Sequence, residues 1–448
     1  MRLLKKYNEI LLLAGFLIYR IALDISYVTF VHPLFEYVRF TLNFSLFKYI
    51  LSMIVLVGLF LILPKDRQKP SSLVQQVHFI LLFIPMLSLY PMMNLSTFFF
   101  LLVSAAFALE CLLLRKLPLL KIVRLRQSGV ILYGGLALVT VFVYVSMIRA
   151  NGMPSLAALN LNAVYDIREK LSYPFLMGYL VPWQSKVINP FFIASAFKNK
   201  NLPMLGAAVA LQLLLYLIIA EKAILFIPAV IVFVMWAVKR FNFLAIAGFL
   251  APAGVIAISA FTDLTGKIEV ASILIRRLLF LPAQLKFIWY DFFSENPLLY
   301  YSQGIIGKIF GIRNPYPLDA ANMIGLTAFN APDMHSNAGY VADAYGNGGA
   351  IGVIVIALIF VFVLLIVDSL SVALSPEFVI GLIIYHVISL NDGSLITAMI
   401  SGGLLPLLLI LWLYSAKPEA ALEKSLAAGA PAVNRKGLPT ATGTGFDN

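Results

Sequence analysis

Residues 350–367 read AIGVIVIALIFVFVLLIV, a run without a single charged side chain. A helix needs about 20 mostly apolar residues to cross the hydrocarbon core of a bilayer, so the surrounding stretch, 349–370, predicts a transmembrane helix. About twelve such runs follow one another along the chain. They lie near 9–31, 41–63, 73–90, 95–114, 129–148, 187–197, 202–220, 223–238, 243–261, 349–370, 376–390 and 395–414. The run 187–197 is too short to span alone and is expected to start near Pro174, to tilt, or to be re-entrant.

The composition excludes a soluble globular enzyme. Of the 448 residues, 61% are hydrophobic and 12% are charged, whereas soluble domains are about half apolar and about a quarter charged. The net charge of +12 would suit a nucleic acid only if it were gathered on a soluble face. It falls instead in short groups between apolar runs, as in polytopic membrane proteins, so no nucleic-acid partner is expected. The chain is predicted to be an all-α polytopic integral membrane protein with about 11–12 transmembrane helices.

Lysines and arginines concentrate in alternate connections, which predicts that both termini are cytoplasmic. The first run carries Arg20 and Asp24 and lacks a small-residue cleavage site, so it predicts a membrane helix rather than a signal peptide. Two longer outside loops remain, 149–186 and 262–348. The predicted order is membrane helices (1–148), a first loop with a short membrane segment (149–200), central membrane helices (201–261), a large loop (262–348), C-terminal membrane helices (349–415) and a flexible cytoplasmic tail (416–448).

An amphipathic helix is predicted in the large loop, over Ser272–Glu295. Arg277, Gln284 and Asp291 recur at intervals of seven, which places them on one face of a helix lying along the membrane surface. Pro282 is expected to bend it.

Four arginines in the outside loops are candidate phosphate ligands, because a guanidinium presents a planar fork of donors that matches phosphate oxygens. The alternative for each is snorkelling to lipid head groups or pairing with Asp166, Glu169 or Asp291. The four are Arg168, Arg276, Arg277 and Arg313.

The segment 330–352 gathers titratable and hydrogen-bonding side chains directly before a membrane span. If a helix begins near Asn337, Tyr340, Asp343 and Asn347 share one face. The glycines at 346, 348, 349 and 352 would allow a helix or a ligand to approach closely. The alternative is a polar helix start with glycine packing and no further role.

The run from Asp343 through Tyr345 and Asn347 to Gly349 and Gly352 resembles the element that closes the large periplasmic loop of bacterial O-antigen and capsule repeat-unit polymerases, the Wzy group. Two other stretches agree with that family: Arg168 with the following residues 178–190, and residues 276–293. The related O-antigen ligases carry a histidine followed by an amide or hydroxyl residue, nine further residues and G-x-x-G. His335-Ser336 fits that spacing to Gly346 and Gly349, but the polymerase element uses the later glycine pair, so both alignments remain open.

The resemblance implies glycosyl transfer at the outer face of the bacterial cytoplasmic (inner) membrane. A growing glycan would move from undecaprenyl diphosphate to a sugar hydroxyl of the next lipid-linked repeat unit. An O-antigen ligase, a flippase or transporter for lipid-linked oligosaccharides, and a scaffold are the alternatives. The expected partners are the undecaprenyl-diphosphate-linked oligosaccharide, the bilayer, a chain-length regulator and a flippase.

Site roles follow from this implied chemistry, in which a diphosphate leaves and a base takes the proton of the acceptor hydroxyl. The four arginines would bind diphosphate, while His335 or Asp343, with Glu295 behind them, would be the base. Sugar contacts are expected from Tyr340, Tyr345, Asn347 and Asp291. No cofactor is expected, and no metal, because the four histidines lie far apart and no carboxylate pair has ligand-like spacing.

Overall fold

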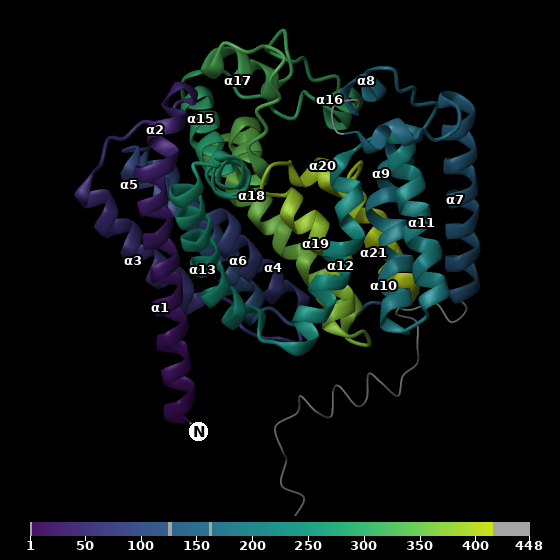
Figure 1. Ribbon diagram of the computed structural model, residues 1–448, viewed down its shortest axis with the longest axis horizontal. Helices are drawn as coiled ribbons and strands as arrows, with labels where there is room; N and C mark the ends of the chain where they lie inside the picture. Colours follow the sequence, from purple (N-terminus) through teal and green to yellow (C-terminus); the bar gives the residue numbers. More distant parts are fainter. Residues whose placement is uncertain (1, 124–127, 161–163, 415–448) are drawn as a thin grey trace, which may run out of the picture.

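The computed structural model describes residues 2–123, 128–160 and 164–414, and within these ranges it is helical without strands. Figure 1 shows the helices running mostly between an upper and a lower end of the molecule. In chain order they are α1 (Arg2–Ser26), α2 (His32–Phe35), α3 (Leu46–Ile62), α4 (Pro70–His78), α5 (Ile84–Met92), α6 (Thr97–Lys116), α7 (Ser128–Asn151), α8 (Val164–Glu169), α9 (Met177–Trp183), α10 (Asn189–Lys198), α11 (Leu202–Ile219), α12 (Lys222–Arg240), α13 (Phe243–Thr265), α14 (Glu269–Ala271), α15 (Leu281–Glu295), α16 (Ile305–Phe310), α17 (Ala320–Phe329), α18 (Gly339–Ser371), α19 (Pro376–Ser389), α20 (Leu395–Met399) and α21 (Leu404–Tyr414). Single 3₁₀ turns occur at Glu36–Val38 and Leu156–Leu159, and π-helical segments at Tyr27–Val31, Phe79–Phe83, Gln184–Ile188 and Ser272–Phe280, the last being η6.

Eight helices in the described part of the chain are long and apolar enough to cross a membrane, which supports a polytopic membrane protein. They are Glu9–Val38, Pro70–Met92, Thr97–Lys116, Gly129–Asn151, Leu202–Ile219, Lys222–Arg240, Phe243–Thr265 and Gly339–Ser371. The predicted runs near 41–63, 376–390 and 395–414 correspond to the shorter apolar helices α3, α19 and α21.

Two predicted runs have different bounds in the structure. The run 187–197 is the second half of a continuous helical stretch that begins at Met177 and ends at Lys198, through α9, a π-helical segment and α10. The run 395–414 is interrupted between α20 and α21 at residues 400–403, where Gly403 has a φ of 95°. Only glycine adopts that conformation without strain, so the break is encoded at this residue.

Helix starts follow local sequence signals. Ser45, Ser96 and Asn201 precede α3, α6 and α11, and each side chain accepts a hydrogen bond from a backbone N–H in the first turn of its helix. This satisfies donors that would otherwise be unpaired at a helix start.

Hydrogen bonds join several connections rich in lysine and arginine at one end of the molecule. Arg67 donates to the oxygen of Phe241, between α12 and α13, at 2.8 Å. The Leu120 amide donates to Ser369, near the end of α18, at 2.8 Å. The opposite, upper end in Figure 1 carries α8, α16 and α17, from the two long predicted loops. The structure therefore groups the chain into a basic end and a loop end.

The predicted amphipathic helix is present as η6 and α15, but the prediction that it lies along the surface is wrong for α15. Gln284 and Lys286 are buried, and α15 packs against α18, α5 and α17. Gln284 donates to the oxygen of Val38 at 3.1 Å instead of facing water. The π-helical segment ends at Phe280, two residues before Pro282, whose ring and missing N–H disturb a regular hydrogen-bond ladder.

Of the four glycines for which the sequence predicted close approach of another helix or a ligand, Gly346 is the one at which another helix packs closely on α18. A Cβ at Gly346 would lie 2.9 Å from the ring of Phe293 on α15, and one at Gly352 would lie 2.3 Å from the oxygen of Ala344. Gly349 interrupts the helix with φ 59° and ψ −149°, a kink that separates the polar first turns from the apolar remainder. A Cβ at Gly348 meets nothing within 4 Å, so this glycine has no packing role.

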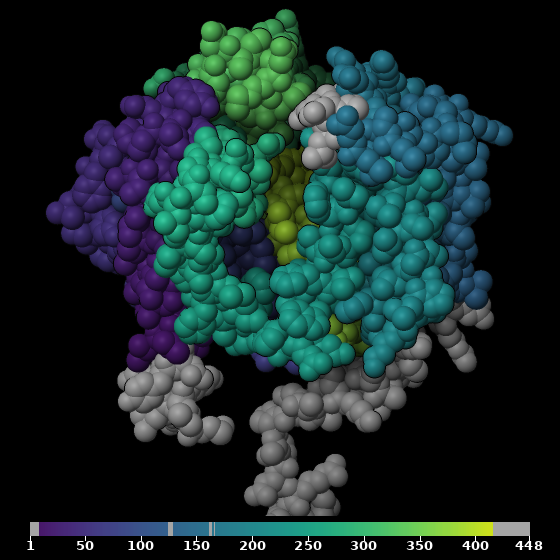
Figure 2. Space-filling model, in the orientation of Figure 1, coloured from purple at the N-terminus to yellow at the C-terminus, as the bar shows by residue number. Residues whose placement is uncertain are grey.

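The surface is hollowed between two neighbouring helices. α12 and α13 are joined by a short connection at the basic end and diverge toward the loop end (Figure 1). Figure 2 shows a deep opening between them, with atoms of the C-terminal helices at its back.

Candidate functional site

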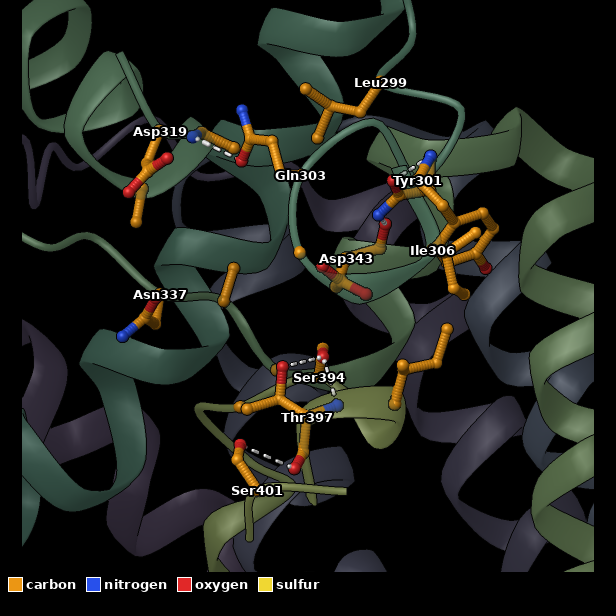
Figure 3. Close-up of a pocket in the computed structure, with 18 of the residues that line it drawn as sticks. Leu299, Tyr301, Gln303, Ile306, Asp319, Asn337, Asp343, Ser394, Thr397 and Ser401 are labelled. Atoms are coloured by element: carbon orange, nitrogen blue, oxygen red, sulfur yellow. Dashed lines mark hydrogen bonds between the residues drawn. The ribbon is translucent and has the colours of Figure 1, made fainter. Parts of the chain in front are cut away.

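A cavity of about 470 Å³ lies at the loop end, beside the first turns of α18. Small-molecule sites are commonly ~300–1,000 Å³, so this space suits a small ligand or part of a larger one. Besides α18, the lining includes Tyr179 on α9, Trp289 on α15 and residues of four further segments: 299–306, 319–321, 335–338 and 392–401. Figure 3 shows Asp343 near the middle of the lining, with side chains of the large loop above it and those of 394–401 below.

Three residues of the predicted site meet in this cavity: His335, Asp343 and Asn347. The Asn347 side chain is fixed by two hydrogen bonds. Its Nδ2 donates to the backbone oxygen of Asp343 at 2.8 Å, and its Oδ1 accepts from the backbone N–H of Tyr301 at 2.8 Å. The Leu299 amide also donates to an α18 backbone oxygen, that of Gly346, at 2.9 Å. The large loop is thereby held on the start of α18, and Asp343 and His335 are placed on the same space.

Two predicted sugar contacts from α18 are buried elsewhere. The Tyr340 hydroxyl donates to the carboxylate of Glu110 on α6 at 3.1 Å, and its ring is buried. Tyr345 packs on Phe99 and Tyr290, with ring centroids 5.7 and 5.0 Å away. Of the three residues on this predicted face, only Asp343 and Asn347 line the cavity, because the Tyr340 side chain is engaged by Glu110 on α6.

Asp291 and Glu295 lie near the end of α15 and are not among the residues lining the cavity. The surrounding protein raises the pKa of Asp291 to about 6, with Arg39 opposing the rise and Glu295 adding to it. Asp291 therefore interacts electrostatically with Arg39 and Glu295, and neither carboxylate lines the cavity.

The four predicted phosphate ligands do not converge on the cavity, because none is among its lining residues. Arg168 and Arg313 are exposed on α8 and after α16. Arg276 places its guanidinium 4.4 Å from the ring centre of Phe35, and burial lowers its pKa. Arg277 is also exposed, but it differs from the other three in its electrostatic interaction with a lining residue: its positive charge opposes the rise that burial causes in the pKa of Asp392.

Asp319 and Asp392 are lining residues that the sequence reasoning missed. Burial raises the pKa of Asp392, while the positive charges of Lys286 and Arg277 oppose the rise. Asp392 stands in the polar sequence 391–394 between two apolar runs, a signal that could have been read as a turn at the site. Asp319 immediately precedes α17 and offers no such signal, since an aspartate there is a common helix start.

The rest of the lining mixes polar, aromatic and aliphatic residues. Gln303 accepts from the amide of Ala320 at 3.0 Å, and Trp289 donates to the oxygen of Ser336 at 2.7 Å. Ser394 and Thr397 bond to each other at 2.8 Å (Figure 3). Hydroxyls, amides, carboxylates and aromatic faces together suit a ligand with many hydroxyl groups. The carboxylates and His335 can also accept a proton from such a ligand.

Within the described ranges, no group of three or more histidine, cysteine or acidic side chains is arranged to hold a metal ion. In comparisons with known proteins, the chain matches no family model, no curated protein and no solved structure.

Proposed function

We propose that this protein transfers a glycan from a lipid diphosphate to a sugar hydroxyl of a second lipid-linked unit, at the loop end of a membrane-embedded helical body. The observation that carries the proposal is the cavity, where residues of the polymerase-like element and His335 share one polar space. The multi-pass helical architecture supports access to a lipid substrate, and the opening between α12 and α13 offers a route from the bilayer.

The proposed reaction needs one proton acceptor. The acceptor hydroxyl attacks the anomeric carbon of the donor, the bond to the diphosphate breaks, and the hydroxyl proton passes to a base. Asp343 is the proposed base because its side chain lies centrally in the lining (Figure 3). His335 is the alternative from the same lining.

Diphosphate binding is proposed at the edge of the cavity, with Arg277 as its main contact. Arg277 makes no side-chain hydrogen bond or salt bridge to a residue the structure describes, so its donors are available. Charge-assisted bonds to a diphosphate would neutralise the leaving group where water is scarce. The other three arginines are proposed to contact lipid head groups.

Reconstitution in liposomes with a purified undecaprenyl-diphosphate-linked repeat unit tests the proposal. A ladder of products is expected from the wild-type protein and none from the Asp343→Asn variant. The matched control is Asp333→Asn, the same chemical change at an exposed residue outside the lining. Failure of the wild type to elongate the lipid-linked unit contradicts the polymerase proposal. Transfer only to added lipid A core identifies a ligase, and movement of intact units across the bilayer without transfer identifies a flippase.

A further inference from the structure

The charges that face the cavity are of one sign. Among the described lining residues, Asp319, Asp343 and Asp392 carry carboxylates, and none is lysine or arginine. His335 is the one histidine among the described lining residues. An anionic ligand would therefore meet three carboxyl groups and no lysine or arginine among the described lining residues.

The nearest cations stay outside the cavity. Lys286 is fully buried behind the segment 391–394, and its Nζ donates to the oxygen of Pro282 and to two oxygens of Asn391. Arg277 influences Asp392 but is not part of the lining. The positive charges of Lys286 and Arg277 favour the ionised form of Asp392. Neither residue lines the cavity, so neither offers hydrogen-bond donors to a ligand inside it.

The uncharged part of the lining suits a sugar ring. Gln303, Asn337, Asn347 and Thr397 present amides and a hydroxyl, and Trp289 and Tyr301 add aromatic surface. Sugar hydroxyls can donate to the three carboxylates and accept from the amides. Such bonds to carboxylates are charge-assisted and stronger than neutral ones.

We propose that this cavity accepts a neutral or amino-bearing sugar and excludes uronic acids and other anionic sugars, while the diphosphate stays outside it, toward Arg277. Exclusion follows because a ligand carboxylate would lose water and gain repulsion from Asp319, Asp343 and Asp392. This inference rests on the proposed function, since it names the substrate class of the same site.

Binding experiments on the full chain in lipid nanodiscs test the inference without relying on turnover. The probes are three trisaccharides of matched linkage built from glucose, glucosamine or glucuronic acid, followed by ligand-observed NMR. The glucose and glucosamine trisaccharides are expected to bind at least tenfold more tightly than the glucuronic acid one. In the double variant Asp319→Asn with Asp392→Asn, the preference should shrink several-fold, whereas Asp333→Asn should leave it unchanged.

The variants are expected to fold. Asparagine also starts helices well, so Asp319→Asn preserves the start of α17. Melting temperatures of all variants verify this before binding is compared.

Each outcome decides a separate question. If the glucuronic acid trisaccharide binds as tightly as the neutral one to the wild type, the inference fails and the proposed function stands. If the preference for neutral sugars persists unchanged in the double variant, the carboxylates are not its cause and the inference fails as well. If the folded protein binds none of the three, the cavity is not a sugar site and the proposed function fails with it.

Discussion

The side-chain nitrogen of Lys286 donates hydrogen bonds to the backbone oxygen of Asn391 at 2.9 Å and to its side-chain oxygen at 3.0 Å. A third bond reaches the oxygen of Pro282 at 3.1 Å, so all three donors of the ammonium group are used. Because Asn391 precedes Asp392, this buried lysine on α15 holds the segment that forms one wall of the cavity. The contact joins residues 105 positions apart in the sequence.

Lys286 makes stability depend on pH in a defined direction. Burial lowers its pKa to about 8, with Asp392 opposing the fall, whereas an unfolded lysine titrates near about 10.4. Between these values the folded state has lost a proton that the unfolded state still holds, so stability through this group rises with pH. The melting temperature of the wild type minus that of Lys286→Met should therefore increase between pH 7.5 and pH 9.5.

The control for this measurement is Lys308→Met, which changes an exposed lysine on α16. Its difference from the wild type should be the same at both pH values. A Lys286→Met difference that does not change with pH would contradict the lowered pKa.

Arg277→Ala is expected to reduce kcat/KM for polymer formation by roughly 10- to 100-fold, the loss of charge-assisted bonds worth about 1.5–3 kcal/mol. Arg276→Ala is the matched control, because its guanidinium lies on the ring of Phe35. This second change should lower stability by about 0.5–2 kcal/mol and leave kcat/KM within about threefold of the wild type. Equal losses of activity from both changes would remove the special role of Arg277.

Gly349→Ala should destabilise the protein by about 1–3 kcal/mol, because its φ of 59° and ψ of −149° are open only to glycine. The neighbouring Gly348→Ala is the control, since an added Cβ there meets nothing within 4 Å. In a helix that exchange is worth about 0.5–1 kcal/mol in favour of alanine. Thermal unfolding in detergent measures the melting temperature of each variant. If the Gly349→Ala variant melts at or above the wild-type temperature, as the control is expected to, the prediction is contradicted.

Polymer formation is expected to persist in excess chelator. The proposed charge stabilisation comes from Arg277 rather than from a divalent ion, and the described residues form no three-ligand cluster. Activity assays with and without EDTA measure this. Loss of product that a divalent cation restores would show that the reaction depends on a metal.

Sequence periodicity predicted the helical architecture well, because the length and polarity of each run are local properties. Each of the twelve predicted apolar runs contains helix in the structure, and the uncertain run 187–197 does start earlier, at Met177. The role of Gly346 as a point of close approach was also readable, because a conspicuous run of glycines before a membrane span indicates tight packing.

The site was only partly predictable. His335, Asp343 and Asn347 were found because they cluster within one segment that runs directly into α18. Asp319 and Asp392 were missed because their role depends on contact between the large loop and the connection from α19 to α20. The four arginines were grouped as phosphate ligands because of their side-chain chemistry alone. In the structure their environments differ, and none of them lines the cavity.

The amino-acid sequence by itself determined that this is a multi-pass helical membrane protein and which segment carries its polar residues, because hydrophobic length and local motifs act over a few helical turns. Only the tertiary structure decided which charges face the cavity. Lys286 is buried behind it, the Tyr340 hydroxyl reaches Glu110 on α6, and Asp319 and Asp392 join the residues that line it. Electrostatic environment depends on the distance through space between groups that lie far apart along the chain, and no local pattern encodes that distance.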